Sequence, residues 1–305
     1  MSTALIAIDW GTSSARAYRL DRDGRILDRK SAPLGVQKVA AGGFPGALRL
    51  LLDGESDDVP RIACGMIGSR QGWIEAPYRD CPAGFTAIAA ALTPVPGTRL
   101  SIVPGLVCRD TAGVPDVMRG EETQIFGALD EPGAWDGARR LVVLPGTHSK
   151  WALVDAHGIE TFATFMTGEL YAVLLEHSIL GRNAAPGSDV AALEEGVKRS
   201  LDADASLSHD LFSARTLALM SKLAPEAVGD YLSGLLLGAE LAAGRRWLER
   251  HAVKEESVTL VGDAPLCERY RRALAIAGVD AMMGSPDAAA HGLWRIAQHA
   301  GMLGR

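Results

Sequence analysis

Two short turns, both rich in glycine and hydroxyl side chains, carry the plainest chemistry in this 305-residue sequence. The first is Gly11-Thr12-Ser13-Ser14 and the second is Gly146-Thr147-His148-Ser149. Backbone N–H groups and hydroxyls in such a turn form a small concave nest for phosphate oxygens, and glycine keeps side chains out of it. One such turn is weak evidence, because ordinary hairpins use the same residues. Two copies predict that a polyphosphate is held from both sides.

Asp9 lies at the end of an apolar run, with one residue between it and the first turn, and Arg16 follows on the next predicted strand. A carboxylate at this place is expected to hold the Mg²⁺ of a bound nucleotide, directly or through water; the alternative is a residue that only caps the turn. Arg16 is expected to reach a phosphoryl oxygen or a substrate carboxylate. Its alternative is a solvated strand residue.

Two adjacent carboxylates, Glu121 and Glu122, begin a predicted helix after Arg119-Gly120. Acidic residues are ordinary at a helix N-terminus because they offset its dipole. Transfer of a phosphoryl group to a hydroxyl, however, needs a base for the hydroxyl proton, which contributes typically about 10²–10⁴-fold. Either glutamate is a candidate for that base. Glu169, after the second hairpin, is expected to bind a substrate hydroxyl or to cap a helix.

The segment from Gly65 to Trp73 predicts a loop for a polyol that carries a carboxylate. Its three glycines permit close backbone approach, and Gly68, Ser69 and Trp73 offer suitable contacts. The alternative is a plain surface loop. The sequence leaves the residue that binds the carboxylate open, with four basic candidates: Arg16, Arg70, Arg119 and Lys150.

The turns are set between apolar runs typical of strands. Residues 4–8, 15–20 and 25–29 predict three strands joined by tight turns, and the pattern returns at 141–144, 151–154 and 159–165. Gly11-Thr12 matches Gly146-Thr147, and Gly24 matches Gly158. A repeat of this length indicates a duplicated domain.

We therefore expect two lobes. The first comprises residues 1–115, with a C-terminal helix at 287–305 that packs back near it. The second, which binds the nucleotide, comprises residues 116–286. A long, apolar helix is predicted over 230–250, and its lack of a polar face indicates burial.

Composition excludes several classes of protein. The net charge of −6 disfavours nucleic acid or an anionic membrane as the main partner, since both demand basic surfaces. No apolar run reaches the length of a membrane span, and the N-terminus has no signal-peptide pattern, so we expect a cytoplasmic protein. The four cysteines form no C-x-x-C pair and are expected to be free thiols. The oligomeric state stays open, with a homodimer as one candidate.

Together these residues resemble the superfamily of sugar kinases, Hsp70 and actin. Residues 6–17 resemble its first phosphate motif, residues 144–155 its second and residues 287–293 its small-residue connecting helix. Residues 258–263 resemble its adenosine motif, although Gly262-Asp263 stands where a Gly-Gly pair is usual. The resemblance implies an α/β, two-lobed actin-like ATPase (ribonuclease H-like) fold, with ATP and Mg²⁺ in a cleft between the lobes and the adenine near Gly262 and Asp263.

Within that superfamily the chain most resembles the 2-dehydro-3-deoxygalactonokinase family. The strings that carry this resemblance are residues 7–11, 65–69, 102–106, 117–124, 145–151 and 166–170. It implies ATP-dependent phosphorylation of 2-dehydro-3-deoxy-D-galactonate at its 6-hydroxyl, in galactonate catabolism. Related kinases carry Gly-Asp-Gln where this chain has Gly120-Glu121-Glu122, so the position implies Glu121 as the base, while the doubled glutamate leaves Glu122 open. The alternatives are a kinase of another sugar acid, such as 2-keto-3-deoxygluconate, and a non-metabolic ATPase switch.

Overall fold

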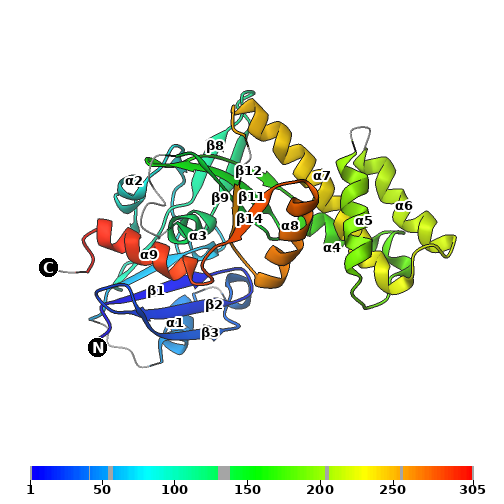
Figure 1. Cartoon of the computed structure of the whole chain (residues 1–305). Helices are drawn as coiled ribbons and strands as arrows, with labels where there is room; N and C mark the ends of the chain where they lie inside the picture. The colour runs from blue at the N-terminus through cyan, green and yellow to red at the C-terminus, as the bar shows by residue number, and fades with distance from the viewer. Residues whose placement is uncertain are drawn as a thin grey trace. The chain divides into compact units, whose positions relative to one another are not determined.

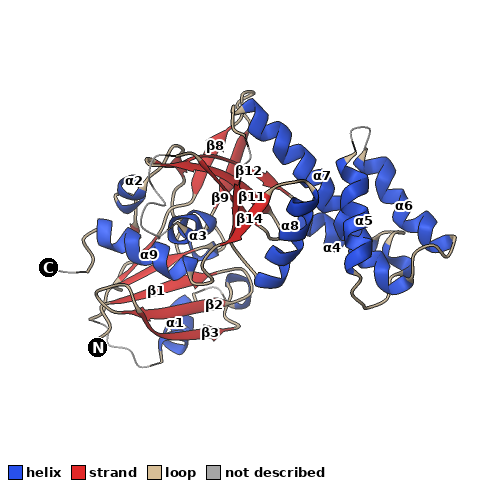
Figure 2. Ribbon diagram, viewed as in Figure 1, coloured by secondary structure: helices blue, strands red, loops and turns tan. Residues whose placement is uncertain are grey.

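The computed structural model describes residues 2–40, 42–53, 58–129, 138–202, 206–254 and 257–303. They form two compact units, each described here by itself. The first unit comprises Met1–Ala138, Leu153–Phe162 and Ser285–Arg305, and the second comprises Arg139–Ala152 and Ala163–Gly284. Figure 1 follows the chain through both units, and Figure 2 shows that each combines sheet and helix.

The main sheet of the first unit has six strands, in the order β3-β2-β1-β4-β7-β6. The first three strands are antiparallel neighbours, whereas β1, β4 and β7 run parallel. The strands are β1 (Leu5–Trp10), β2 (Ala15–Leu20), β3 (Ile26–Ala32), β4 (Arg61–Cys64), β6 (Thr93–Pro94) and β7 (Leu100–Ile102). The predicted hairpin of three strands is confirmed, and β1 is apolar because it lies inside the sheet, buried along most of its length.

Helices cover this sheet. α1 (Phe44–Leu52) packs against β2 and β3, and α9 (Ala288–His299) packs against β1 and β4. Next to α9 lie α2 (Phe85–Ala89) and α3 (Glu121–Ala128), as Figure 1 shows. α3 and α9 approach closely: a Cβ added to Gly127 would lie 1.8 Å from the Ala288 carbonyl oxygen. Glycine at this position therefore sets the distance between the two helices.

A small sheet, β5-β8-β9, completes the first unit with β5 (Arg79–Asp80), β8 (Leu106–Arg109) and β9 (Pro115–Met118). Residues 153–162, which form the end of a hairpin that starts in the second unit, also belong to the first unit. Ala83 and Ile159 exchange two backbone hydrogen bonds of 3.0 Å, and the Cys108 thiol donates to the Phe162 carbonyl at 3.2 Å.

The second unit repeats the order of the first around its own sheet, β12-β11-β10-β13-β14. β10, β13 and β14 run parallel, as β1, β4 and β7 do. The strands are β10 (Arg140–Leu144), β11 (Ser149–Asp155), β12 (Gly158–Phe165), β13 (Ser257–Leu260) and β14 (Asp280–Met283). The shared order agrees with the predicted duplication.

Five helices of the described chain accompany this sheet: α4 (Thr167–His177), α5 (Val190–Leu201), α6 (Leu207–Leu219), α7 (Val228–Arg250) and α8 (Ala264–Ile276). α7 is the predicted long helix. It is buried on most sides because α4, α5, α6 and α8 all pack against it. α5 and α6 were not predicted from the sequence.

The boundary between the units differs from the one expected after residue 115. Residues 116–129 belong to the first unit because β9 pairs with β8 and α3 packs on α9. Residues 153–162 join it through the Ala83–Ile159 bridge. The C-terminal helix packs within the first unit, at α2, α3, β1 and β4.

Candidate active site

Asp9 and Arg16 face each other across the first hairpin. They are register partners on β1 and β2, with Cys64 as the partner of Asp9 on β4. Burial raises the pKa of Asp9, and the positive charge of Arg16 opposes this rise. Arg16 is exposed and also hydrogen-bonds the Tyr18 hydroxyl, whose pKa is raised by burial. Asp9 is thus a partly buried carboxylate with incomplete charge compensation, which suits a cation at the end of β1.

The first turn is held by its own backbone and by a neighbouring loop. The Gly11 N–H donates to the Ser14 carbonyl at 2.9 Å, while Val36 and Gln37 donate to the carbonyls of Gly11 and Thr12. Thr12 and Ser13 are exposed. A Cβ on Gly35 would lie 2.2 Å from the Ser13 carbonyl carbon, so glycine is required where the loop meets the turn.

Glu121 and Glu122 stand at the start of α3 but occupy different environments. Glu121 is partly exposed, and its carboxylate accepts the Arg119 N–H at 2.9 Å. Glu122 is fully buried; it accepts the Gly120 N–H at 2.7 Å and the Thr123 hydroxyl at 3.1 Å. Burial, with the Glu121 charge second, raises the pKa of Glu122 to about 8. A catalytic base must reach its substrate. Of these two carboxylates, only that of Glu121 is accessible to a substrate.

Gly65 brings the end of β1 and the start of α3 together. It has a φ of +89°, and its added Cβ would lie 2.8 Å from the Trp10 carbonyl oxygen and 3.6 Å from Asp9 Oδ1. Gly120, with φ of +108°, would place a Cβ 3.1 Å from Gly65 Cα. Two glycines in the left-handed region thus let two carboxylate-bearing segments meet.

Cys64 and Thr123 also belong to this cluster, although neither was predicted from the sequence. Burial raises the pKa of Cys64 well above its ordinary value, and the charges of Asp9, Glu122 and Glu121 act in the same direction. The Cys64 thiol lies 4.0 Å from Asp9 Oδ1 and stays protonated in this acidic setting. The only sequence signal that Cys64 lies near Asp9 was its position at the end of a predicted strand.

The predicted substrate loop follows β4 and contacts Arg119. A Cβ on Gly68 would lie 2.9 Å from Arg119 Nη1, and Arg119 Nη2 donates to the Ala76 carbonyl at 2.8 Å. The guanidinium also lies 4.4 Å from the centre of the Tyr78 ring. Its Nε and Nη1 are buried without a hydrogen-bond partner, and so is the Ser69 hydroxyl.

Two other side chains of this loop, Trp73 and Arg70, make contacts away from Arg119. Trp73 stacks on Phe44 with ring centres 5.9 Å apart and packs against the core of the first unit. Arg70 is exposed and pairs with Glu75 at 3.2 Å.

In the second unit, Gly146 to His148 form a turn with Thr147 and His148 exposed. The start of α4 packs against this turn: the Glu169 N–H donates to the Thr147 carbonyl at 3.0 Å, and His148 Nε2 lies 2.5 Å from the Glu169 carboxylate. Glu169 therefore pairs with the turn itself.

The Ser149 hydroxyl is buried and directed inward. It donates to Glu240 at 2.7 Å, as do the Trp151 indole at 2.8 Å and the Tyr270 hydroxyl at 2.7 Å. Burial raises the pKa of Glu240, and hydrogen bonds from Thr167 and from these three donors oppose the rise. The buried Lys150 ammonium donates to the Thr164 hydroxyl at 2.7 Å. Glu240 is distant in sequence and belongs to the apolar helix α7. A charged residue in so apolar a helix was the only sequence signal for this hydrogen-bond network.

Gly262 and Asp263 follow β13 and are exposed. A Cβ on Gly262 would lie 3.3 Å from the Pro145 carbonyl oxygen, so this loop runs beside the second turn. Asp263 caps α8 by accepting the Leu266 N–H at 3.2 Å.

The described residues hold no group of three or more potential metal ligands among His, Cys, Asp and Glu. Mg²⁺ needs no such cage, because it is commonly held by one or two carboxylates together with water and substrate phosphates. Asp9 fits that role. In the described part of the chain, no helix has the length and apolarity needed to cross a membrane. All four cysteines are free thiols, as expected.

Two units with a shared strand order, each with a glycine turn after its first strand, have the duplicated, two-lobed fold of actin, Hsp70 and the sugar kinases. The chain belongs to the 2-keto-3-deoxy-galactonokinase family, whose profile matches residues 9–296. It is 37% identical over 293 residues to the 2-dehydro-3-deoxygalactonokinase of Escherichia coli (strain K12), covering 95% of each chain.

Solved structures agree with this assignment. A crystal structure of a proposed 2-dehydro-3-deoxygalactonokinase from Sinorhizobium meliloti shares 37% identity and a TM-score of 0.88, covering 96% of this chain and 98% of that one. Component A of the (R)-2-hydroxyglutaryl-CoA dehydratase of Acidaminococcus fermentans, at 13% identity and a TM-score of 0.51 over 96% of this chain and 95% of that one, shares the fold alone.

Proposed function

We propose that the protein transfers the terminal phosphoryl group of ATP to the 6-hydroxyl of 2-dehydro-3-deoxy-D-galactonate, in the cytoplasm, as a step of galactonate catabolism. The observation that carries this proposal is the family match over residues 9–296. The site supports it, because each unit offers one glycine turn for phosphates and the first adds an accessible carboxylate, Glu121, for the acceptor hydroxyl.

In this proposal Glu121 takes the proton from the 6-hydroxyl as that oxygen attacks the terminal phosphorus. The Arg119 N–H, which donates to Glu121, fixes the orientation of the carboxylate. The buried Glu122 is a positioning residue that fastens Gly120 and the start of α3. Positioning and charge neutralisation supply most of the rate enhancement in phosphoryl transfer.

The first turn, residues 11–14, and the second, residues 146–148, are proposed to bind the phosphates of ATP mainly through backbone N–H groups. Ser149 supports the second turn from inside through Glu240. Gly262 and Asp263 are proposed to border the adenosine. Mg²⁺ would be held at Asp9, where it would neutralise charge on the phosphates.

We assign the substrate carboxylate to Arg119. Two of its N–H groups and the Ser69 hydroxyl are buried without a partner. Buried N–H groups of a cation that lack an acceptor are costly, and a substrate carboxylate would supply acceptor oxygens to this guanidinium. Arg70 is a poorer candidate because it is exposed and already paired with Glu75.

The test is a coupled assay of ADP release with ATP, Mg²⁺ and a panel of 2-keto-3-deoxy sugar acids and neutral sugars. Turnover should be highest with 2-dehydro-3-deoxy-D-galactonate. Glu121→Gln should lower kcat by about 10²–10⁴-fold. Preference for 2-keto-3-deoxygluconate would redirect the assignment to that acid, and slow ATP hydrolysis unaffected by any sugar acid would refute the proposed reaction.

Arg119→Gln should raise KM for the sugar acid by roughly 10–100-fold, the value of a charged hydrogen bond, while KM for ATP stays constant. Arg70→Gln is the matched control and should leave both constants unchanged. An equal effect of both variants would contradict the assignment of Arg119.

A further inference from the structure

A buried set of polar side chains connects Asp9 to the start of α3, and the proposed mechanism does not use its central members, Cys64 and Thr123. Both side chains are fully buried. Cys64 ends β4 beside Asp9, its register partner on β1, and Thr123 lies in the first turn of α3. All three residues belong to the first unit. Because neither Cys64 nor Thr123 is exposed, any role in the reaction has to be exerted through a neighbour.

The hydrogen bonds of this set form one continuous path. The Cys64 thiol donates to Asp9 Oδ1 at 4.0 Å, and the Thr123 hydroxyl is hydrogen-bonded to the Cys64 side chain. The Thr123 hydroxyl also donates to Glu122 Oε1 at 3.1 Å, and Glu122 Oε2 accepts the Gly120 N–H at 2.7 Å. The path thus runs from the proposed metal ligand to the N-terminal cap of α3.

Close backbone contacts hold Thr123 in place. A Cβ on Gly292 of α9 would lie 1.9 Å from the Thr123 carbonyl oxygen, so α9 packs directly on this residue. A Cβ on Gly120 would lie 3.1 Å from Gly65 Cα, so the start of α3 also touches the residue that follows Cys64. Closely packed interiors leave little room for movement. The Thr123 hydroxyl is therefore held at a defined position relative to β4.

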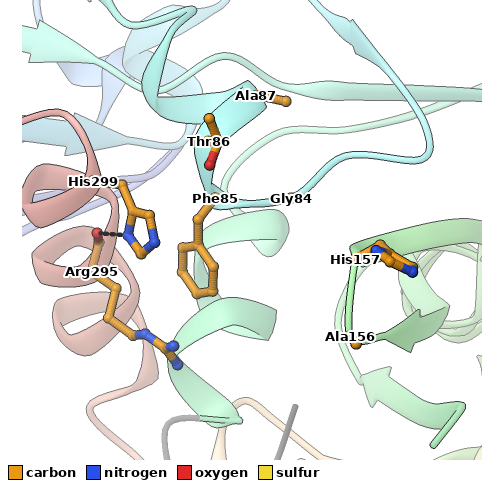
Figure 3. Close-up of a pocket in the computed structure, with 9 residues that line it drawn as sticks. Gly84, Phe85, Thr86, Ala87, Ala156, His157, Arg295 and His299 are labelled. Carbon is orange, nitrogen blue, oxygen red and sulfur yellow. Dashed lines mark hydrogen bonds between the residues drawn. The ribbon is translucent and has the colours of Figure 1, made fainter. Parts of the chain in front are cut away.

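The far end of α3 is fixed as well. Phe85 of α2 packs on the buried Phe126 with ring centres 4.3 Å apart, and Arg295 donates to the Leu129 carbonyl at 3.5 Å. Leu129 is the C-terminal cap of α3. Figure 3 shows Phe85 beside Arg295 and His299 on one wall of a cavity of about 510 Å³. With both ends held, α3 is a fixed support for the hydroxyl that it carries.

Asp9 is the residue that such a support would serve. A carboxylate can rotate about its last torsion, which has only broad preferences, and a donor on one oxygen restricts that rotation. Hydrogen-bond partners of a metal-binding side chain orient it, and their loss typically lowers the affinity for the metal. The thiol donates to Oδ1. The second oxygen, Oδ2, is then the one offered to a cation.

We propose that Cys64 and Thr123 are positioning residues for the metal site. Through Oδ1 they set the orientation in which Asp9 presents its other oxygen to Mg²⁺. The same path fastens the start of α3, where the proposed base Glu121 lies, so the metal-binding carboxylate and the base keep a constant separation. The inference rests on the proposed function for the role of Asp9. It adds that the metal site depends on two side chains that touch neither metal nor substrate.

Titration calorimetry on the full chain measures the dissociation constant of a non-hydrolysable ATP analogue twice, once with excess Mg²⁺ and once with EDTA. The ratio of the two constants reports how much the metal adds to binding. Thr123→Val removes the hydroxyl and keeps the branched shape. It should lower the affinity with Mg²⁺ by roughly 3–10-fold, the value of a neutral hydrogen bond, while the affinity without metal stays constant. Thr123→Ser keeps the hydroxyl and should bind as the parent protein does in both titrations.

Cys64→Ala is the second variant, which removes the donor next to Asp9 and should lower the affinity with Mg²⁺ at least as much. Thr98→Val is the matched control, because the Thr98 hydroxyl also makes two hydrogen bonds in the first unit, to Val95 and Leu100. This control should bind as the parent protein does. A loss of equal size with and without Mg²⁺, or an unchanged affinity in either Thr123→Val or Cys64→Ala, would overturn the positioning role.

Asp9→Asn separates this inference from the proposed function. If Asp9→Asn abolishes the effect of Mg²⁺ while Thr123→Val and Cys64→Ala bind normally, the positioning role is wrong and the metal site stands. If Asp9→Asn responds to Mg²⁺ as the parent protein does, the proposed role of Asp9 is wrong and the positioning role is refuted with it. Variants that all bind as expected, in a protein that phosphorylates no sugar acid, would refute the proposed reaction and support the positioning role.

Discussion

Replacing Glu122 by Gln should stabilise the protein, and increasingly so as the pH rises. Glu122 is fully buried at the start of α3, and burial raises its pKa from 4.5 to about 8. The unfolded chain therefore loses this proton at a lower pH than the folded protein does. Between these two pKa values the folded state binds more protons, so its stability falls as the pH increases.

The size of the effect follows from the two values. A rise from 4.5 to about 8 corresponds to about 5 kcal/mol when the carboxylate is fully ionised, and about 3 kcal/mol of this is already lost at pH 7. Gln keeps the shape of the side chain and an oxygen for the Gly120 N–H, and it has no charge to bury. Glu122→Gln should thus match the parent protein near pH 4.5 and exceed its stability above pH 7.

The assay is urea unfolding at fixed ionic strength from pH 5 to pH 9, with the free energy of unfolding of the variant compared with that of the parent protein. Glu121→Gln is the control. It removes the same charge from a partly exposed position, and should give only the smaller gain that comes from lowering the pKa of its neighbour. A Glu122→Gln variant no more stable than the parent protein at pH 9 would refute the reasoning, since it would mean that the ionised carboxylate is compensated in the fold.

Three further predictions concern close packing and buried polar groups. Gly127→Ala should cost about 3 kcal/mol or more in urea unfolding, because its Cβ would overlap the Ala288 carbonyl, whereas Gly46→Ala in α1, whose added Cβ would meet only Arg49 Nη2 at 3.9 Å, should be neutral or slightly stabilising. Glu240→Gln should cost about 1–3 kcal/mol by thermal unfolding, because four side-chain donors converge on that carboxylate, and the exposed Glu226→Gln should cost nothing. Gly35→Ala should raise KM for ATP about tenfold or more in steady-state kinetics by displacing the first turn; an unchanged KM would remove that turn from the nucleotide site.

The hairpins of both units could be predicted from sequence because the residues that determine them are close together in the chain. Alternating apolar and turn residues fix a strand–turn–strand segment over about 25 residues, and repetition of that pattern indicates duplication. The start of α3 was predictable for the same reason, since its acidic first turn and preceding glycine lie together in the sequence. Position in the sequence already favoured Glu121 over Glu122 as the proposed base, and the exposure of Glu121 beside the buried Glu122 supports that proposal.

The features that were not predicted depend on contacts between distant segments. The extension of the first unit to residue 138 results from pairing of β9 with β8 and packing of α3 on α9, which no local pattern reveals. Helices α5 and α6 pack mainly on α7, far from any motif, although the Asp189 N-cap of α5 was a local signal that could have indicated that helix.

The two glycine turns, alike in sequence, differ in how their hydroxyl groups are used. Ser13 is exposed at the first turn, whereas Ser149 is buried and donates to Glu240. Their common property is therefore the backbone, since Gly11 and Gly146 each follow the first strand of a sheet with the same strand order. The proposed binding of phosphate depends on backbone N–H groups, so duplication can preserve it while the serine of one copy becomes part of the core. Sequence matching identifies the positions of such turns correctly, but the role of each side chain has to be determined separately in each copy.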